Sequence, residues 1–228
     1  ALDELVFSSG KVSMRDLRKA LADDFEGHEP LRQRCLNAPK FGQDNGRADQ
    51  HAIRILNVAT EEFDRASRLG SPDAVIASRC LTTDMGHIGA GVRLGATPDG
   101  RHAGRPVSDN ISPSPGSCTR GITAMLRSVS KLPFNRITSG ALNVRIQRRL
   151  VSGEDGLSRL TALLQTYFDM GGLQVQLSIA DTAELRDAQN HPEAHRDLMV
   201  RITGYSAVFT DMCRNAQDEI IRRQEMDG

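Results

Sequence analysis

The sequence of 228 residues predicts an α/β fold, because strand-like apolar runs alternate with amphipathic helical segments through its second half. The alternation covers residues 140–146 (strand), 157–169 (helix), 173–179 (strand), 182–190 (helix) and 198–203 (strand). A helix between two strands allows them to pair in parallel, so this order is typical of crossover units. The first half instead predicts helices followed by a long irregular segment.

Three helices are predicted before residue 70. Ser13 is an N-cap residue for the first of them. The apolar face of this helix consists of Leu17, Ala20 and Leu21. A short second helix covers residues 30–37 and ends at Pro39. The third covers residues 48–69 and ends at Gly70. Its apolar positions at helical spacing are Ile53, Leu56, Phe63 and Ala66.

The middle of the chain predicts less regular structure. A buried strand is predicted over residues 75–81, and a helix over residues 121–131. Between them, residues 86–116 are rich in glycine and proline and are predicted to be irregular. Irregular segments of this length are usually functional or wrapped around a larger body. A last helix is predicted over residues 215–223.

Composition excludes several classes of function. Lysine plus arginine and aspartate plus glutamate balance at 29 each, which predicts neither nucleic-acid nor membrane-surface binding. No apolar run is long enough to cross a bilayer, and no signal peptide is present, so a cytoplasmic location is expected. The four cysteines lack zinc-ligand spacing and the six histidines do not cluster with them. No metal site is predicted in this chain.

Residues 201–209, Arg-Ile-Thr-Gly-Tyr-Ser-Ala-Val-Phe, are the most informative part of the sequence. They place Gly204 between a β-branched run and two aromatic residues. By itself, an isolated glycine after a strand is usually an ordinary turn or bulge residue.

Further segments with counterparts in one protein family lie along nearly the whole chain. They are Ala1–Val6, Asp24–Gly27, Leu36–Gly42, Gly95–Arg101, Ser108–Pro113, Asp187–Glu193, Arg196–Val200 and Gln217–Arg223. Together with residues 201–209 they resemble, in order, the C-terminal portion of the glycyl radical enzymes, the superfamily of pyruvate formate-lyase, diol dehydratase and choline trimethylamine-lyase. The resemblance identifies Gly204 as the radical site. Glycine suits this role, because a radical on a backbone α-carbon is stabilised when that carbon flattens, and glycine alone has no Cβ to crowd the planar geometry. The resemblance also implies that Arg201, Thr203, Tyr205, Ser206 and Phe209 form the loop that shields Gly204.

The resemblance implies a fold and a division of the chain. The fold would be the C-terminal part of an α/β barrel, with the radical loop near the C-terminus. Residues 1–110 would end the pyruvate formate-lyase-like barrel domain, and residues 111–228 would form the glycyl radical domain. Part of a barrel exposes a strand edge and apolar faces, so the chain alone is expected to self-associate or to dissolve poorly.

The resemblance also implies partners. A separate activating enzyme that uses S-adenosylmethionine and an iron–sulfur cluster would generate the radical on Gly204. The radical would then pass to a cysteine in an upstream portion. None of Cys35, Cys80, Cys118 and Cys213 has the sequence setting of that cysteine. The chain is therefore expected to be the C-terminal part of a longer, homo-oligomeric, oxygen-sensitive enzyme of anaerobic metabolism, inactive on its own.

The reaction is predicted less sharply. Gly204-Tyr205-Ser206-Ala207 followed by Phe209 is more similar to the dehydratase and C–N lyase branch, which indicates elimination of water or an amine from a small substrate. Alternatives are a formate C-acetyltransferase, an arylacetate decarboxylase, an alkylsuccinate synthase, or a non-catalytic spare part that supplies a fresh glycyl loop.

Two further patterns need interpretation. Gln174, Gln176 and Ser178 share one face of a predicted strand, and with Asn143 they line either a substrate cavity or a solvated surface. Residues 89–95, Gly-Ala-Gly-Val-Arg-Leu-Gly, imitate a dinucleotide fingerprint. They run directly into Thr-Pro-Asp-Gly, which ends a helix, so nucleotide binding is not predicted.

Overall fold

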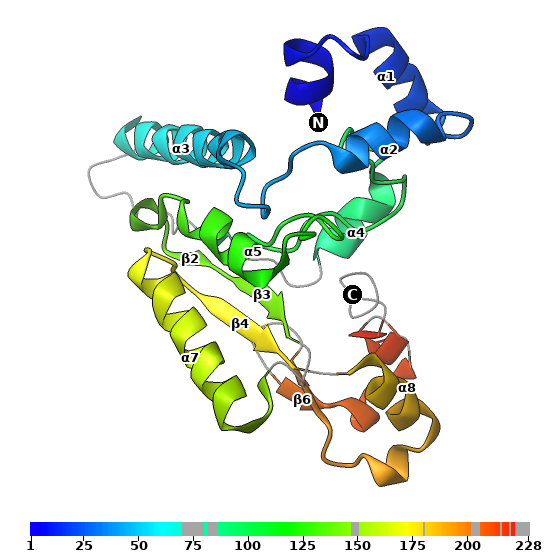
Figure 1. Cartoon of the computed structure of the whole chain (residues 1–228), viewed down its shortest axis with the longest axis vertical. Coiled ribbons are helices and arrows are strands. Elements are labelled where there is room, and N and C mark those ends of the chain that lie inside the picture. The colour runs from blue at the N-terminus through cyan, green and yellow to red at the C-terminus, as the bar shows by residue number, and fades with distance from the viewer. Residues whose placement is uncertain are drawn as a thin grey trace.

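The structure is a computed structural model, and it describes residues 1–69, 80–81, 86–146, 151–179, 181–201, 206–214, 216–218 and 220–221. Three apolar clusters divide these residues into an N-terminal helical part, a central α/β part and a C-terminal part (Figure 1). Among the described helices, none is long and apolar enough to cross a membrane.

The N-terminal part consists of η1 (Asp3–Ser8), α1 (Met14–Ala22) and α2 (Glu29–Asn37). The predicted cap of α1 is confirmed, because the Asp16 amide donates to the Ser13 hydroxyl oxygen at 3.0 Å. Leu17 and Ala20 are buried in the cluster of this part, and Leu21 packs against it. The predicted helix over residues 30–37 corresponds to α2.

The loop after residue 94 fastens the N-terminal part to the rest of the chain. Arg32 Nε donates to the carbonyl of Gly100 at 3.0 Å, and the amide of Ala103 donates to Asp24 Oδ1 at 2.8 Å. Gly100 has φ +95°, and a Cβ there would lie 2.7 Å from the side chain of Leu36. Glycine is therefore required at this position by both conformation and space.

Helix α3 (Gly46–Leu69) begins two residues before its predicted start. Ile53 and Leu56 join the central apolar cluster as expected. Phe63, which belongs to the same predicted apolar face, is instead 49% exposed. The described central cluster takes up the first half of the apolar face of α3, and Phe63 lies beyond it.

The prediction of irregular structure over residues 86–116 is wrong at its start, where α4 (Gly86–Arg93) is helical. Packing explains this helix despite its low intrinsic propensity. A Cβ on Gly91 would lie 2.2 Å from the carbonyl oxygen of Arg105, so glycine lets the helix approach the following loop. Part of the dinucleotide-like run thus lies inside a helix.

The central part contains two pairs of parallel strands. Strand β1 (Cys80–Leu81) pairs with β2 (Ser139–Gly140), and β3 (Leu142–Arg145) pairs with β4 (Val175–Ser178). The single predicted strand over residues 140–146 is therefore interrupted at Ala141, whose carbonyl accepts from the Ile111 amide at 3.3 Å. Most of the predicted strand over residues 75–81 lies outside the described residues.

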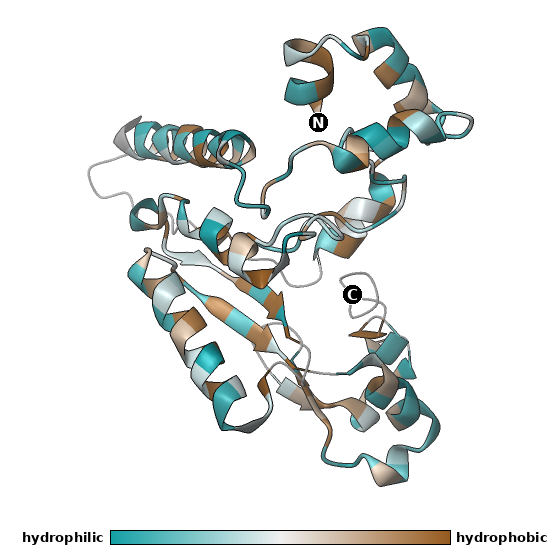
Figure 2. Ribbon diagram, viewed as in Figure 1, coloured by the Kyte–Doolittle hydropathy of each residue, from teal (hydrophilic) through white to brown (hydrophobic). Residues whose placement is uncertain are grey.

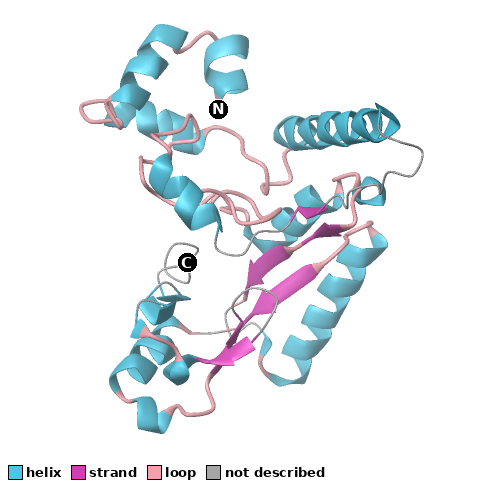
Figure 3. Cartoon of the chain, turned by 180° about the vertical axis from the view of Figure 1, so that it is seen from behind, coloured by secondary structure: helices cyan, strands magenta, loops and turns pink. Residues whose placement is uncertain are grey.

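Helices α5 (Gly121–Ser130) and α7 (Gly153–Asp169) pack on one face of β3 and β4, and α7 begins four residues before its predicted start (Figures 1 and 3). The strands show alternating apolar and polar colour in Figure 2. Leu142 and Val144 point into the core, with 0% and 1% exposure. The parallel strands and their helical crossover confirm the predicted α/β class.

The C-terminal part begins with α8 (Thr182–Asn190) and η3 (Pro192–Ala194). Strands β5 (Met199–Arg201) and β6 (Ser206–Val208) then form an antiparallel hairpin, followed by η4 (Phe209–Asp211). Within the predicted last helix, residues 215–223, the described positions 216–218 and 220–221 are helical, and the others lie outside the described residues. Ile220 and Ile221 are described and belong to the apolar cluster of this part.

Candidate radical site

The hairpin of β5 and β6 brackets the glycine that the sequence singles out. Arg201 pairs with Ser206 as the last described pair, and Arg201 Nη1 donates to Ser206 Oγ at 3.2 Å. Only residues 202–205 separate these two positions in the sequence. Gly204 itself, with Thr203 and Tyr205, lies outside the described residues. Arg201 and Ser206 are both exposed.

Phe209 anchors the base of the hairpin. Its side chain is fully buried, its amide donates to the carbonyl of Leu198 at 2.8 Å, and its carbonyl accepts from Gln217 Nε2 at 2.9 Å. Gln217 is itself buried. A buried polar side chain that donates to a backbone carbonyl fixes the local path of the chain. Breaking this hydrogen bond would leave two buried polar groups without partners.

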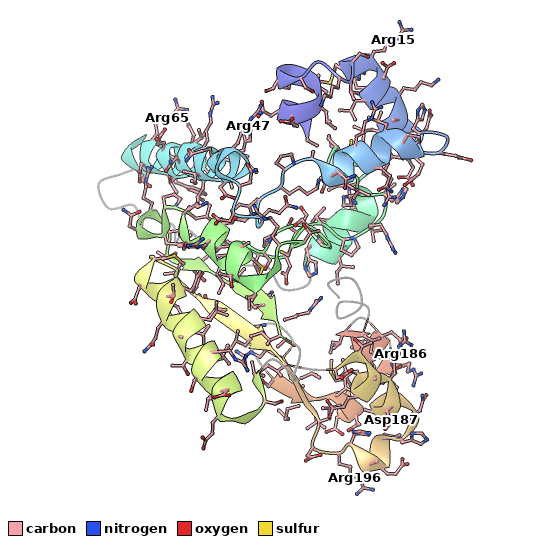
Figure 4. The ribbon with its side chains drawn as sticks, in the orientation of Figure 1. Arg15, Arg47, Arg65, Arg186, Asp187 and Arg196 are labelled. Atoms are coloured by element: carbon pink, nitrogen blue, oxygen red, sulfur yellow. The ribbon has the colours of Figure 1, made fainter. Side chains whose placement is uncertain are left out.

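Asp187 holds the turn that leads into the hairpin. Its carboxylate accepts from His191 Nδ1 at 2.9 Å and from His195 Nε2 at 2.7 Å. Figure 4 shows Asp187 on α8 in the C-terminal part. The hydrogen bond from His195, followed by that from His191, holds the pKa of Asp187 below its usual value.

The hairpin lies beside the parallel sheet. Strand β5 contacts β4, and the arrowheads of β3 and β4 point toward the hairpin in both views (Figures 1 and 3). In parallel α/β sheets, ligands bind outside the carboxyl ends of the strands. The hairpin therefore lies at the edge of the sheet where chemistry is usually placed.

The sheet face turned away from α5 and α7 carries polar side chains. Asn143 pairs in register with Gln176, and Arg145 pairs with Ser178, so these four residues share one face. Of the polar positions that the sequence predicts together, Asn143, Gln176 and Ser178 are thus brought onto one surface. Gln174 differs, because it precedes β4 and is exposed.

Gln174 has a structural contact that the sequence did not indicate. Its carbonyl accepts from the Tyr167 hydroxyl at 3.3 Å, and the Tyr167 side chain is fully buried. Burial raises the pKa of Tyr167 to about 12, so the phenol stays protonated and donates. The backbone of Gln174 therefore helps to close the turn between α7 and β4.

Sequence reasoning missed two residues on the polar side of the sheet. His87 is buried at the start of α4, and its Nδ1 lies 3.5 Å from Asp109 Oδ1. Asn143 Nδ2 donates to the other oxygen of Asp109. The segment Ser108–Pro113 was recognised only as part of the resemblance, and no local signal indicated that it would reach β3.

The four cysteines differ in exposure. Cys35 is fully buried, and burial raises the pKa of its thiol, so it is a poor nucleophile. Cys80, Cys118 and Cys213 are exposed. Within the described ranges, no group of three or more histidine, cysteine, aspartate or glutamate residues is arranged to hold a metal ion.

Comparison with known families agrees with this geometry. Residues 107–210 match the family described as "Glycine radical", and residues 1–84 match "Pyruvate formate lyase-like". The segment that matches the glycine radical family thus follows the segment that matches the pyruvate formate lyase-like family. The chain belongs to the glycyl radical enzyme family.

Three similar proteins illustrate the relationship. The probable dehydratase YbiW of Escherichia coli (strain K12) is 37% identical over 99% of this chain and 29% of its own length. Indoleacetate decarboxylase of Tractidigestivibacter scatoligenes is 38% identical over 85% of the chain and 22% of its own length. The glycerol-bound B12-independent glycerol dehydratase from Clostridium butyricum superposes with a TM-score of 0.86 at 34% identity, covering 96% of the chain and 28% of that structure.

These values confirm the predicted fold, a C-terminal part of the glycyl radical enzyme fold. The chain spans less than a third of the length of the curated relatives that it matches. The relatives include dehydratases and a decarboxylase.

Proposed function

We propose that Gly204 stores the radical of an oxygen-sensitive enzyme and that this chain is the radical-bearing part of that enzyme. The observation that carries the proposal is the hairpin of β5 and β6, which lies beside the carboxyl ends of β3 and β4. Its Arg201–Ser206 pair flanks Gly204 in the sequence. The match of residues 107–210 to the glycine radical family supports it. The division near residue 110 is supported by the boundaries of the two matched segments.

The chain's own residues would protect and position the radical. Phe209 closes the base of the hairpin against water, and the Arg201–Ser206 hydrogen bond limits its opening. Thr203 and Tyr205 flank the glycine in the sequence and complete the proposed shield. A radical S-adenosylmethionine activating enzyme would supply the hydrogen abstraction, and an upstream cysteine-bearing portion would receive the radical.

The reaction we favour is elimination of water or an amine from a small substrate. Similarity to the probable dehydratase and to the glycerol dehydratase supports this reaction class. The polar face with Asn143 and Gln176 would form part of the cavity wall, where amide groups can hydrogen-bond a hydroxyl or ammonium group. Gln174, exposed just before β4, would lie at the rim.

A decarboxylase is the second candidate, because the indoleacetate decarboxylase is similar to the same degree. A non-catalytic spare part is less well supported, since residues 1–84 match the barrel segment that precedes the radical domain. A cytoplasmic location and a homo-oligomeric assembly remain predictions of the sequence.

Controlled exposure to oxygen tests the radical position. The protein, joined with its cysteine-bearing portion and activated without oxygen, is expected to be cut at Gly204 when air is admitted. Mass spectrometry would then find a new C-terminus at that residue. An intact chain after a radical signal has been recorded would contradict the assignment to Gly204. Incubation of the activated protein with glycerol before air exposure tests the reaction class. Formation of an aldehyde would indicate dehydration of glycerol, and no aldehyde would mean that the enzyme does not use this polyol.

A further inference from the structure

A buried histidine–aspartate pair lies beside the polar face of the sheet. The His87 side chain is 7% exposed, and its Nδ1 lies 3.5 Å from Asp109 Oδ1. This is an ion-pair distance, longer than a normal hydrogen bond. Asp109 is a charged group within ion-pair range of His87.

Asn143 holds the carboxylate in place. Its Nδ2 donates to Asp109 Oδ2, while its backbone amide donates to Ser112 Oγ at 3.1 Å. Since a carboxylate only accepts, the amide nitrogen must be the atom that faces it. One side of Asp109 is thus occupied by a residue of β3, and the other oxygen is left for His87.

The remaining oxygen of Asp109 needs a donor. Within the described part of the chain, Asp109 Oδ1 is buried and accepts no conventional hydrogen bond. Leaving a buried carboxylate oxygen without a donor is costly, and a proton on His87 Nδ1 is the donor placed to supply one. Protonation at Nδ1 is therefore the tautomer that Asp109 favours.

The backbone next to Asp109 is also unusual. Asn110 has φ +50°, in the left-handed region, which asparagine tolerates better than most residues. Such conformations persist where the surroundings impose them, and they concentrate at functional sites. Contacts on both sides of Asn110 constrain its backbone conformation. They are the Ile111–Ala141 backbone hydrogen bond and the hydrogen bond of Asp109 with Asn143.

We propose that Asp109, anchored by Asn143, fixes His87 in the tautomer protonated at Nδ1, so that Nε2 is the nitrogen that gains and loses a proton. Asp109 and Asn143 are then positioning residues, and His87 is an acid–base group beside the polar face. The use of such a group rests on the proposed function, because a departing hydroxyl or amine must take up a proton. The tautomer itself does not depend on any radical.

The substitution Asp109→Asn gives a sharp test. The side-chain amide of the variant would keep an oxygen for Asn143 Nδ2, but its NH₂ group would face His87 and require a bare Nδ1. The expected result is an inverted tautomer, from mainly Nδ1–H in the wild type to mainly Nε2–H in the variant. The fold should be retained, because the carboxylate and the amide have nearly the same shape.

The measurement is a set of ¹⁵N-histidine NMR spectra of the chain, with the His87 signals assigned by His87→Gln. Titration between about pH 5 and 8 should change the ¹⁵N chemical shift of His87 Nε2, while Nδ1 remains protonated in the wild type. Asp24→Asn is the matched control, because Asp24 Oδ1 lies 3.2 Å from Nδ1 of His102, a partly exposed histidine. It should leave the His87 signals unchanged.

Three results would overturn the proposal. They are an Nε2–H tautomer in the wild type, the same tautomer in wild type and Asp109→Asn, and an Nε2 signal that does not titrate in this range. Failure of the proposed function is distinguishable, since it would appear as a missing glycyl radical in a protein whose His87 tautomer is as described.

Discussion

Replacing Lys131 by methionine should destabilise the central part strongly. Lys131 Nζ lies 2.7 Å from Asp49 Oδ2 and 2.7 Å from Asp44 Oδ1, which ties the end of α5 to the start of α3. Asp49 has no exposed surface. Methionine keeps most of the volume of lysine but cannot donate, so the variant leaves a buried carboxylate without its cation.

The size of the effect follows from that burial. Removing one partner of a fully buried ion pair costs about 3–5 kcal/mol, because the remaining charge stays desolvated. The Lys131 side chain is 36% exposed, which places this pair at the lower end of that range. With a urea dependence of about 2 kcal/mol per M, a loss of about 3 kcal/mol lowers the unfolding midpoint by roughly 1.5 M. Within the described residues, the second oxygen of Asp49, Oδ1, has no hydrogen-bond partner, which removes one route for compensation.

Urea unfolding followed by circular dichroism measures the loss. Arg127→Ala is the matched control, since Arg127 contacts Asp44 at 3.4 Å with a side chain that is 60% exposed. Its cost should be at most about 1 kcal/mol. Adding Asp49→Asn to Lys131→Met should restore part of the stability, because it removes the buried carboxylate that has lost its cation. Equal midpoints for wild type and Lys131→Met would refute the reasoning.

Three other changes test separate parts of the structure. Gly91→Ala should cost about 1–3 kcal/mol by thermal unfolding, because its Cβ would meet the Arg105 carbonyl at 2.2 Å, whereas Gly89→Ala, with open space around it, should not destabilise. Phe209→Ala should cost about 3–5 kcal/mol and shorten the lifetime of a radical in the hairpin, and an unchanged decay would remove its shielding role. Asp187 has a folded pKa below its unfolded value, so its stabilisation is present above pH 3.8 and lost as the pH falls through the folded pKa; Asp187→Ala should flatten that part of the stability–pH curve.

Local signals predicted the elements that depend on local chemistry. The Ser13 cap lies where a side-chain oxygen can accept from an amide three residues away, and the sequence shows this directly. The crossover order of strands and helices likewise follows from periodicity. Helix α4 was missed, because Gly89 and Gly91 argue against a helix and only the approach of the loop at Arg105 favours it.

The sequence predicted the residues of the site that lie close together in the chain, but not those that the tertiary fold brings together. Gly204 and Phe209 lie in one continuous stretch, so a resemblance could identify them together. The contact of Asn143 with Asp109 joins residues 34 positions apart, and that of His87 with Asp109 joins an α-helix to a loop. Neither contact leaves a local pattern. Only the tertiary path of residues 107–113 brings these groups together.

The most direct test of the central claim is an anoxic electron paramagnetic resonance spectrum. The protein is treated with its activating enzyme and S-adenosylmethionine, with Gly204→Ala as the comparison. A glycyl doublet in the wild type that is absent from Gly204→Ala is the predicted result. A doublet that persists in Gly204→Ala would contradict the assignment of the radical to this residue.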